Sequence, residues 1–170
     1  IFEYDSVGNL KKVTDGEGRI TTMNYDDLDR MINSTDPANP TTTFGYDENG
    51  NRRSVTDALS RQWTAIYDTK NRLVTVTDAL PTPRVTRWQY DTADQLLKIT
   101  SPSGRVTRYT YDERGQRETF TNGLGNVMTF AYDNRGYLKT LTDQRGHTTT
   151  FEYDELFRLI GQRDPLGRLT

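Results

Sequence analysis

The chain has 170 residues, of which 32% are apolar and 27% charged, and its formal net charge at pH 7 is −2. So small an apolar fraction cannot fill a thick interior. Charges of both signs are spread along the chain and give no field that would gather nucleic acid or anionic lipid. The absence of cysteine excludes disulfide bonds and thiolate metal sites, and no run approaches the roughly 20 apolar residues of a membrane-spanning helix.

A Tyr-Asp pair recurs along the whole chain at nearly constant spacing. The pairs are Tyr4-Asp5, Tyr25-Asp26, Tyr46-Asp47, Tyr67-Asp68, Tyr90-Asp91, Tyr111-Asp112, Tyr132-Asp133 and Tyr153-Asp154. Successive pairs lie 21 residues apart, except for one interval of 23. A fixed period of this length indicates a repeat array. Eight repeats occupy residues 1–170, so we expect no second domain. Residue 1 falls within the pattern, and the chain therefore reads as a segment of a longer protein.

Each repeat predicts two short strands bounded by turns. When the Tyr is counted as position zero, turn-forming residues follow it directly and return near position eleven, as in residues 16–19 and 103–105. The intervening runs, such as residues 105–111 and 146–153, alternate in polarity and are rich in Thr, Val and aromatic residues. This pattern favours strands over helix. Short turns should join about sixteen strands into one antiparallel meander.

Two repeats depart from the regular pattern, and both do so in the second turn. Residues 80–84 carry the two-residue insertion, and residues 36–40 contain two prolines. Insertions at turns leave strands in register, as a stacked hairpin array requires.

The aromatic residues concentrate in two columns of the repeat. Fourteen of the 18 aromatic side chains lie at position zero or at position minus two, where Phe44, Trp88 and Tyr109 are examples. Residues two apart on a strand share a face. We therefore expect a ladder of rings on one buried face, which should be the main source of stability. Because open sheets of more than about ten strands curl, this face should line a curved inner surface or pack against another turn of a spiral.

The repeated Asp residues predict turn capping rather than catalysis. A short carboxylate that opens a turn can accept a hydrogen bond from the backbone N–H two residues further on. The single histidine, His147, occupies a turn position that holds Arg in other repeats, so we interpret it as a surface residue. Calcium-binding repeats space their acidic residues more closely than this chain does. We therefore expect no catalytic residue, cofactor or metal, and a hydrolase is the least favoured function.

One group of residues could contact a ligand. Arg87 and Arg108 share position minus three of their repeats, and Trp88 lies beside Arg87 in the sequence. Two strands of separation correspond to about 10 Å, so Arg87, Trp88 and Arg108 form a candidate patch for a phosphate or a sugar. The preferred interpretation is a solvated outer face.

The repeat also resembles a known family. Residues 111–115 (Tyr-Asp-Glu-Arg-Gly), 132–138 (Tyr-Asp-Asn-Arg-Gly-Tyr-Leu) and 164–170 (Asp-Pro-Leu-Gly-Arg-Leu-Thr) are similar to the YD repeat of Rhs (rearrangement hotspot) proteins. The resemblance covers the whole chain and implies a β-ribbon that spirals into a hollow shell. Such shells enclose a toxic C-terminal domain in bacterial Rhs and Tc-type toxins, and a similar barrel serves adhesion in teneurins. The self-cleaving segment that closes bacterial shells is not matched, so the resemblance assigns no catalytic residue here.

Two classes of function follow from these observations. The preferred hypothesis is a non-catalytic shell segment whose partners are neighbouring repeats of the same chain and an enclosed toxin or effector polypeptide. The alternatives are a carbohydrate- or cell-wall-binding repeat module, with a glycan as partner, and a teneurin-like adhesion barrel. From the resemblance we expect a secreted or cell-surface location as part of an exported bacterial protein. Trp-rich pockets would favour the binding module, but the chain has only two Trp residues.

Overall fold

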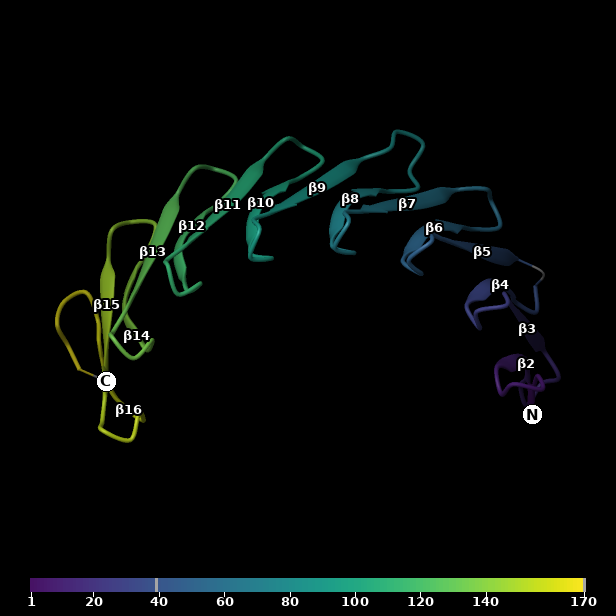
Figure 1. Cartoon of the computed structure of the whole chain (residues 1–170), viewed down its shortest axis with the longest axis horizontal. Helices are drawn as coiled ribbons and strands as arrows, with labels where there is room; N and C mark the ends of the chain where they lie inside the picture. The colour runs from purple at the N-terminus through teal and green to yellow at the C-terminus, as the bar shows by residue number, and fades with distance from the viewer. Residues whose placement is uncertain (39, 170) are drawn as a thin grey trace. The chain divides into compact units, whose positions relative to one another are not determined.

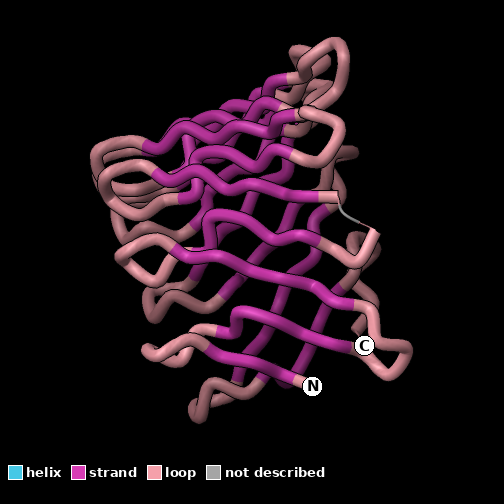
Figure 2. Tube along the Cα trace, turned by 90° about the vertical axis from the view of Figure 1, so that its right-hand side faces the viewer, coloured by secondary structure: helices cyan, strands magenta, loops and turns pink. Residues whose placement is uncertain are grey.

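A computed structural model describes residues 1–38 and 40–169, and within these residues the chain forms strands and connecting loops without any helix (Figure 2). The strands are β1 (Phe2–Tyr4), β2 (Leu10–Thr14), β3 (Ile20–Tyr25), β4 (Met31–Thr35), β5 (Thr41–Tyr46), β6 (Arg52–Thr56), β7 (Gln62–Tyr67), β8 (Leu73–Thr77), β9 (Val85–Tyr90), β10 (Leu96–Thr100), β11 (Val106–Tyr111), β12 (Arg117–Thr121), β13 (Val127–Tyr132), β14 (Leu138–Thr142), β15 (Thr148–Tyr153) and β16 (Leu159–Arg163). Each repeat thus supplies one strand that ends at its Tyr and one that begins six residues later.

The order of strands in the sheet is their order in the chain. The chain divides into two compact units, residues 1–86 and 87–170. The first contains β1 to β8, the second contains β10 to β16, and the boundary falls within β9 (Figure 1). Strand pairs within each unit are antiparallel. The predicted all-β array of antiparallel hairpins is confirmed.

A β-bulge recurs in the hairpin that follows each Tyr. In the first repeat, Glu3 lies opposite Lys12 and Tyr4 lies opposite Leu10, so Lys11 is the extra residue of β2. Leu10 and Val13 are three residues apart, an odd number that would place them on opposite faces of a regular strand. Both lie across from residues of the aromatic face, because the bulge restores the alternation. The second unit shifts register in the same way between Leu96 and Lys98.

The two faces of the sheet differ in composition and exposure. In β11, Tyr109 and Tyr111 are half-buried, whereas Arg108 and Thr110 on the other face are exposed. Cross-strand pairs fill the aromatic face. Tyr109 lies opposite Phe120 with ring centroids 5.6 Å apart, a separation typical of favourable ring pairs.

The aromatic ladder is less buried than the sequence predicts. Ala65, at 5% exposure, is the one buried hydrophobic residue among those described, and Tyr4 is 60% exposed. The physical reason is that each unit is a single layer of sheet. A ring can then be covered by its neighbours along the face while its outer side stays open. The ladder predicted for a buried face is therefore corrected to a half-buried one.

Candidate functional site

The Asp of every Tyr-Asp pair closes the turn that follows it. Its Oδ1 accepts hydrogen bonds from the backbone N–H groups two and four residues further on, at 2.8–3.0 Å in all eight repeats. In the sixth repeat the donors to Asp112 are Arg114 and Gln116. The backbone of Asp112 also binds both ends of the turn, since its N–H donates to Gln116 O and its carbonyl accepts from Gly115. These are the hydrogen bonds expected of a turn-capping residue.

The second turn of the repeat uses the same geometry. Asp57 accepts hydrogen bonds from the N–H groups of Leu59 and Arg61, and Asn122 accepts the equivalent pair at 2.9 and 3.0 Å. Asn122 shows that an uncharged acceptor oxygen can cap this turn as the carboxylate does. The fourth residue of these turns has positive φ, which favours Gly, as at Gly125 (φ 87°) in the turn of Asn122.

The Tyr of the pair links one repeat to the repeat before it. The hydroxyl of Tyr111 donates to the carbonyl of Leu96 at 2.9 Å. Leu96 adjoins the bulge and lies outside the paired segment of β10 and β11, which begins at Lys98. A backbone carbonyl at this point needs another donor, and the phenol supplies it. The same bond recurs in both units as Tyr25–Leu10, Tyr46–Met31, Tyr67–Arg52, Tyr132–Arg117 and Tyr153–Leu138.

Side chains of the first turn also connect neighbouring repeats. Asn9 Nδ2 donates to Asp29 Oδ1 at 2.8 Å, and Asn51 Nδ2 donates to Asn71 Oδ1 at 2.8 Å. In the second unit the Nε2 of Gln116 reaches Gly136 O at 2.7 Å. All three donors occupy the last position of the turn. These hydrogen bonds link successive turns at the ends of the strands.

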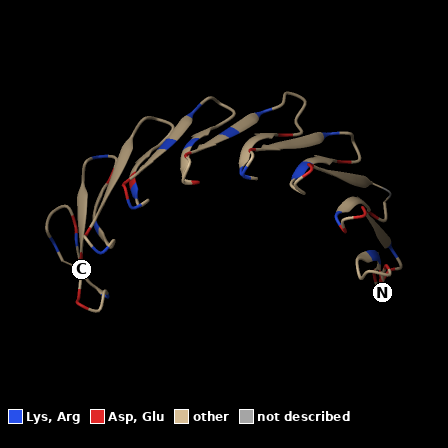
Figure 3. Cartoon of the chain, viewed as in Figure 1, with Lys and Arg blue, Asp and Glu red and all other residues tan. Residues whose placement is uncertain are grey.

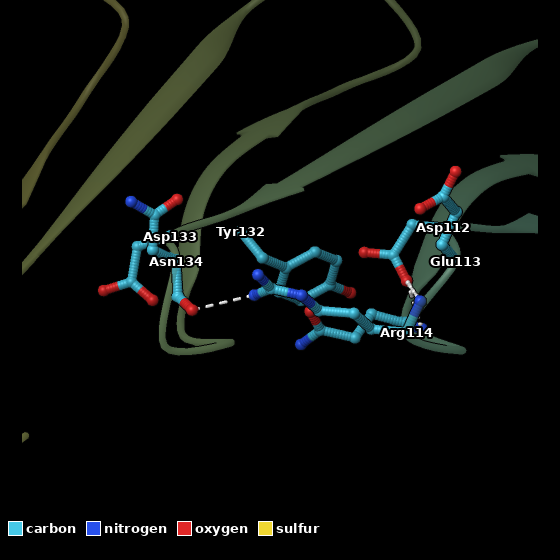
Figure 4. A pocket seen from close by; sticks show the side chains of 7 residues that line it. Asp112, Glu113, Arg114, Tyr132, Asp133 and Asn134 are labelled. Carbon is cyan, nitrogen blue, oxygen red and sulfur yellow. Dashed lines mark hydrogen bonds between the residues drawn. The ribbon is translucent and has the colours of Figure 1, made fainter.

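A shallow hollow of about 340 Å³ lies between two of these linked turns (Figure 4). Arg114 crosses it and donates from Nη1 to Asn134 O at 2.8 Å. Tyr132 and Asp133 line the hollow, but both make the hydrogen bonds that recur along the array. Similar hollows lie between other turns, as between the turns that contain Asp5 and Asp26. Repetition of this kind indicates spaces between repeats rather than one specialised site.

Basic side chains at the turns hold the pKa of several Asp carboxyls below the usual range. At Asp57 the side-chain hydrogen bond from Arg61 is the largest cause of the lowered pKa, and partial desolvation opposes it. The two side chains form an ion pair at 2.6 Å. Asp68 and Arg72 repeat the arrangement at 2.7 Å. The carboxylates are thus occupied by backbone and guanidinium donors, which leaves them poor general bases.

His147 lies in the second turn of its repeat, where its backbone N–H donates to Asp143 Oδ1 at 2.9 Å. Its Nδ1 is 3.4 Å from Asp143 Oδ2, and the side chain is 58% exposed. Within the described residues no cluster of three or more acidic or histidine side chains is arranged to hold a metal ion. The same part of the chain contains no helix able to cross a membrane.

The structure separates the three residues of the candidate ligand patch. Arg87 lies opposite Thr100, and the next residue, Trp88, lies opposite Ile99. Adjacent residues of a strand project to opposite faces, so Trp88 belongs to the aromatic face and Arg87 to the polar face. Arg108 lies on the polar face with Arg87. The ring of Trp88 therefore does not share a face with the two guanidinium groups.

Removal of one turn-capping carboxylate should destabilise the array. Replacement of Asp112 by Ala leaves two N–H donors without their acceptor, and we expect a loss of about 1–2 kcal/mol in the free energy of unfolding. Asp112→Asn keeps an acceptor oxygen, as Asn122 does naturally, and should cost less than half as much. Urea denaturation followed by circular dichroism measures both. Equal losses for the two variants would mean that charge, and not the acceptor geometry, matters at this position.

Comparison with known proteins places the array in a family. The sequence model of the Teneurin YD-shell family matches residues 31–170, and that of the RHS repeat matches residues 4–41. A search of curated proteins found no match.

Several solved structures share the fold. A crystal structure of TcdB2-TccC3 has a TM-score of 0.56 and 16% identity, and the match covers 99% of this chain and 12% of that one. The structure of TcdB2-TccC3-Cdc42 has a TM-score of 0.54 and 15% identity, and the match covers 99% of this chain and 12% of that one. The structure of the Photorhabdus luminescens Tc holotoxin pore has a TM-score of 0.54 and 16% identity. That match covers 99% of this chain and 11% of the other. This chain therefore spans about a tenth of the length of these structures.

The family match extends over most of the chain, and the Asp of the Tyr-Asp pair caps its turn in all eight repeats. The predicted resemblance to YD-repeat proteins is thus confirmed. The chain belongs to the Teneurin YD-shell family.

Proposed function

We propose that the chain is a non-catalytic wall segment of an Rhs-type shell that encloses or scaffolds a toxin or effector polypeptide. The observation that carries this proposal is the single-layer construction of each unit. A layer with one half-buried aromatic face and one polar face has the form of a wall and not of a self-contained core. Large aromatic faces left open on a protein mark surfaces that contact another polypeptide.

The repeat residues support a structural role. The Tyr and Asp side chains that sequence reasoning singled out are occupied by hydrogen bonds within and between repeats. A catalytic group would have to be free to meet a substrate. The partners in this proposal are neighbouring repeats of the same chain and the enclosed polypeptide, and the parent protein would be exported from a bacterium to act outside the cell.

Protease protection tests this function in the parent protein. If the repeats form a wall, a chain segment enclosed by it should resist limited proteolysis. The double variant Tyr111→Ala with Tyr132→Ala, which removes two consecutive links between repeats, should expose that segment to cleavage. The matched control is Thr110→Ala with Thr129→Ala on the polar face, which should leave protection unchanged. Complete digestion of every segment outside the repeats in the unmodified protein would refute the proposal.

A teneurin-like adhesion barrel is the second candidate, and the family match over residues 31–170 is the observation that favours it. It predicts that the parent protein, displayed on cells, causes them to aggregate. Aggregation without any protected internal segment would favour adhesion over encapsulation.

A further inference from the structure

Three cations lie together on the polar face of β9, β10 and β11 in the second unit. Lys98 of β10 is directly opposite Arg108 of β11, and Arg87 of β9 lies opposite Thr100, two residues along β10 from Lys98. Diagonal neighbours of this kind are about 7–8 Å apart. Figure 3 shows basic residues on each of these three strands. We call Arg87, Lys98 and Arg108 the cation strip.

The strip lacks the carboxylates that neutralise cations elsewhere. In the described part of the chain, ion pairs involve several turn Arg residues, Lys12 of β2 and Arg163 of β16, but none involves a member of the strip. Like charges directly opposite each other on neighbouring strands are destabilising. Arg87 and Arg108 are exposed and Lys98 is half-buried. The fold therefore presents an unneutralised positive surface at some cost to its own stability.

The first repeat provides an internal comparison for the same lattice position. Lys12 occupies the place of Lys98, and Glu3 occupies the place of Gln89. Lys12 Nζ lies 2.6 Å from Glu3 Oε1, whereas Gln89 offers Lys98 no charge. On the following strand, Lys12 lies opposite Thr22, whereas Lys98 lies opposite Arg108. Both cross-strand neighbours of Lys98 thus differ from those of Lys12: Gln89 replaces a Glu, and Arg108 replaces a Thr.

We infer that the cation strip binds an acidic segment of a polypeptide, with carboxylates on alternate residues. The strip extends over two interstrand spacings, about 10 Å, which is wider than one phosphate group. An extended chain places residues i and i+2 on one side, roughly 6.6–6.8 Å apart, so two successive carboxylates can contact different cations. Arginine forks also bind carboxylates through two parallel hydrogen bonds.

The surroundings of the strip disfavour a long polyanion such as nucleic acid. The turns that end β9 and β11 carry Asp91, Asp94, Asp112 and Glu113, and the whole chain has a net charge of −2. A phosphate backbone that continued beyond the three strands would approach these carboxylates. A short acidic peptide segment can end before them.

The test is a binding titration with the full chain. The probe is a fluorescein-labelled peptide of four Glu-Thr units, and its match is the same peptide with Gln in place of Glu. We expect saturable binding of the acidic peptide, weaker at higher salt because the contacts are exposed, and none of the neutral one.

Variants decide whether the strip is the site. Gln89→Glu recreates the Glu3–Lys12 arrangement and should weaken binding about tenfold. It should also leave the melting temperature unchanged or raise it, because it relieves repulsion between Lys98 and Arg108. Lys12→Gln, at the neutral equivalent position, should bind like the unmodified chain. Failure of the acidic peptide to bind, equal affinity of Gln89→Glu, or tighter binding of a 12-nucleotide DNA strand or inorganic phosphate would each overturn the inference.

Discussion

Replacement of Tyr111 by Ala should lower the free energy of unfolding by about 2–3 kcal/mol. The ring is half-buried, so the cost lies below the 3–5 kcal/mol of a fully buried aromatic residue. Loss of the hydroxyl makes a second contribution to this change, because the Leu96 carbonyl then has no donor from Tyr111. Tyr111→Phe isolates that part and should cost about 1 kcal/mol. Denaturant unfolding of the two variants measures both contributions.

The control for this prediction is Tyr4, which has the same place in its repeat. It is 60% exposed and lies in β1, which pairs only with β2 in the described sheet. Tyr4→Ala should therefore change the free energy of unfolding by less than about 0.5 kcal/mol. A loss below about 1 kcal/mol for Tyr111→Ala, or a loss at Tyr4 as large as at Tyr111, would show that contact between repeats does not stabilise the array.

Acidification should unfold the array through its turn carboxylates. The side-chain hydrogen bond from Arg61 lowers the pKa of Asp57, and the backbone N–H of His147 lowers the pKa of Asp143. The pKa is also lowered in the folded chain at Asp5, Asp15, Asp26, Asp47, Asp68, Asp78, Asp133, Asp154 and Asp164. Each such carboxyl binds a proton more tightly in the unfolded chain, so stability falls as pH falls.

The pH window follows from the direction of these shifts. The stabilisation is fully present well above the unfolded pKa of Asp, about 3.9. It is lost as pH falls from about 5 through the lower folded values. Melting temperatures between pH 7 and pH 2.5 should therefore be level at first and then drop steeply below about pH 4. Asp57→Asn should make the drop shallower. A melting temperature that stays constant or rises between pH 5 and pH 3 would contradict the role of the carboxylates.

Much of the fold could be predicted from the spacing of Tyr-Asp pairs and the alternation of the runs between them. The β-bulge was not predicted, although the sequence contains a signal for it. Leu10 and Val13 are both apolar but three residues apart, which a regular strand with one apolar face cannot accommodate. Such spacing indicates one extra residue between them, and the structure places Lys11 there.

The candidate site was only partly predictable for a similar reason. Turn capping by Asp depends on local geometry and follows from the sequence. The bond from Tyr111 to Leu96 joins residues 15 apart and depends on a carbonyl that the bulge leaves outside the ladder. Trp88 adjoins Arg87 in the sequence but lies on the other face, because neighbouring residues of a strand point in opposite directions.

Footprinting with hydroxyl radicals tests the central claim most directly. The isolated chain and the same residues within the parent protein are labelled, and oxidation of the aromatic columns is compared with that of the polar face. If each unit is a wall whose aromatic face contacts another polypeptide, Tyr109, Phe130 and Met128 should be labelled in the isolated chain and protected in the parent. Protection in the isolated chain, or labelling that is the same in both, would contradict a single-layer wall that encloses a partner.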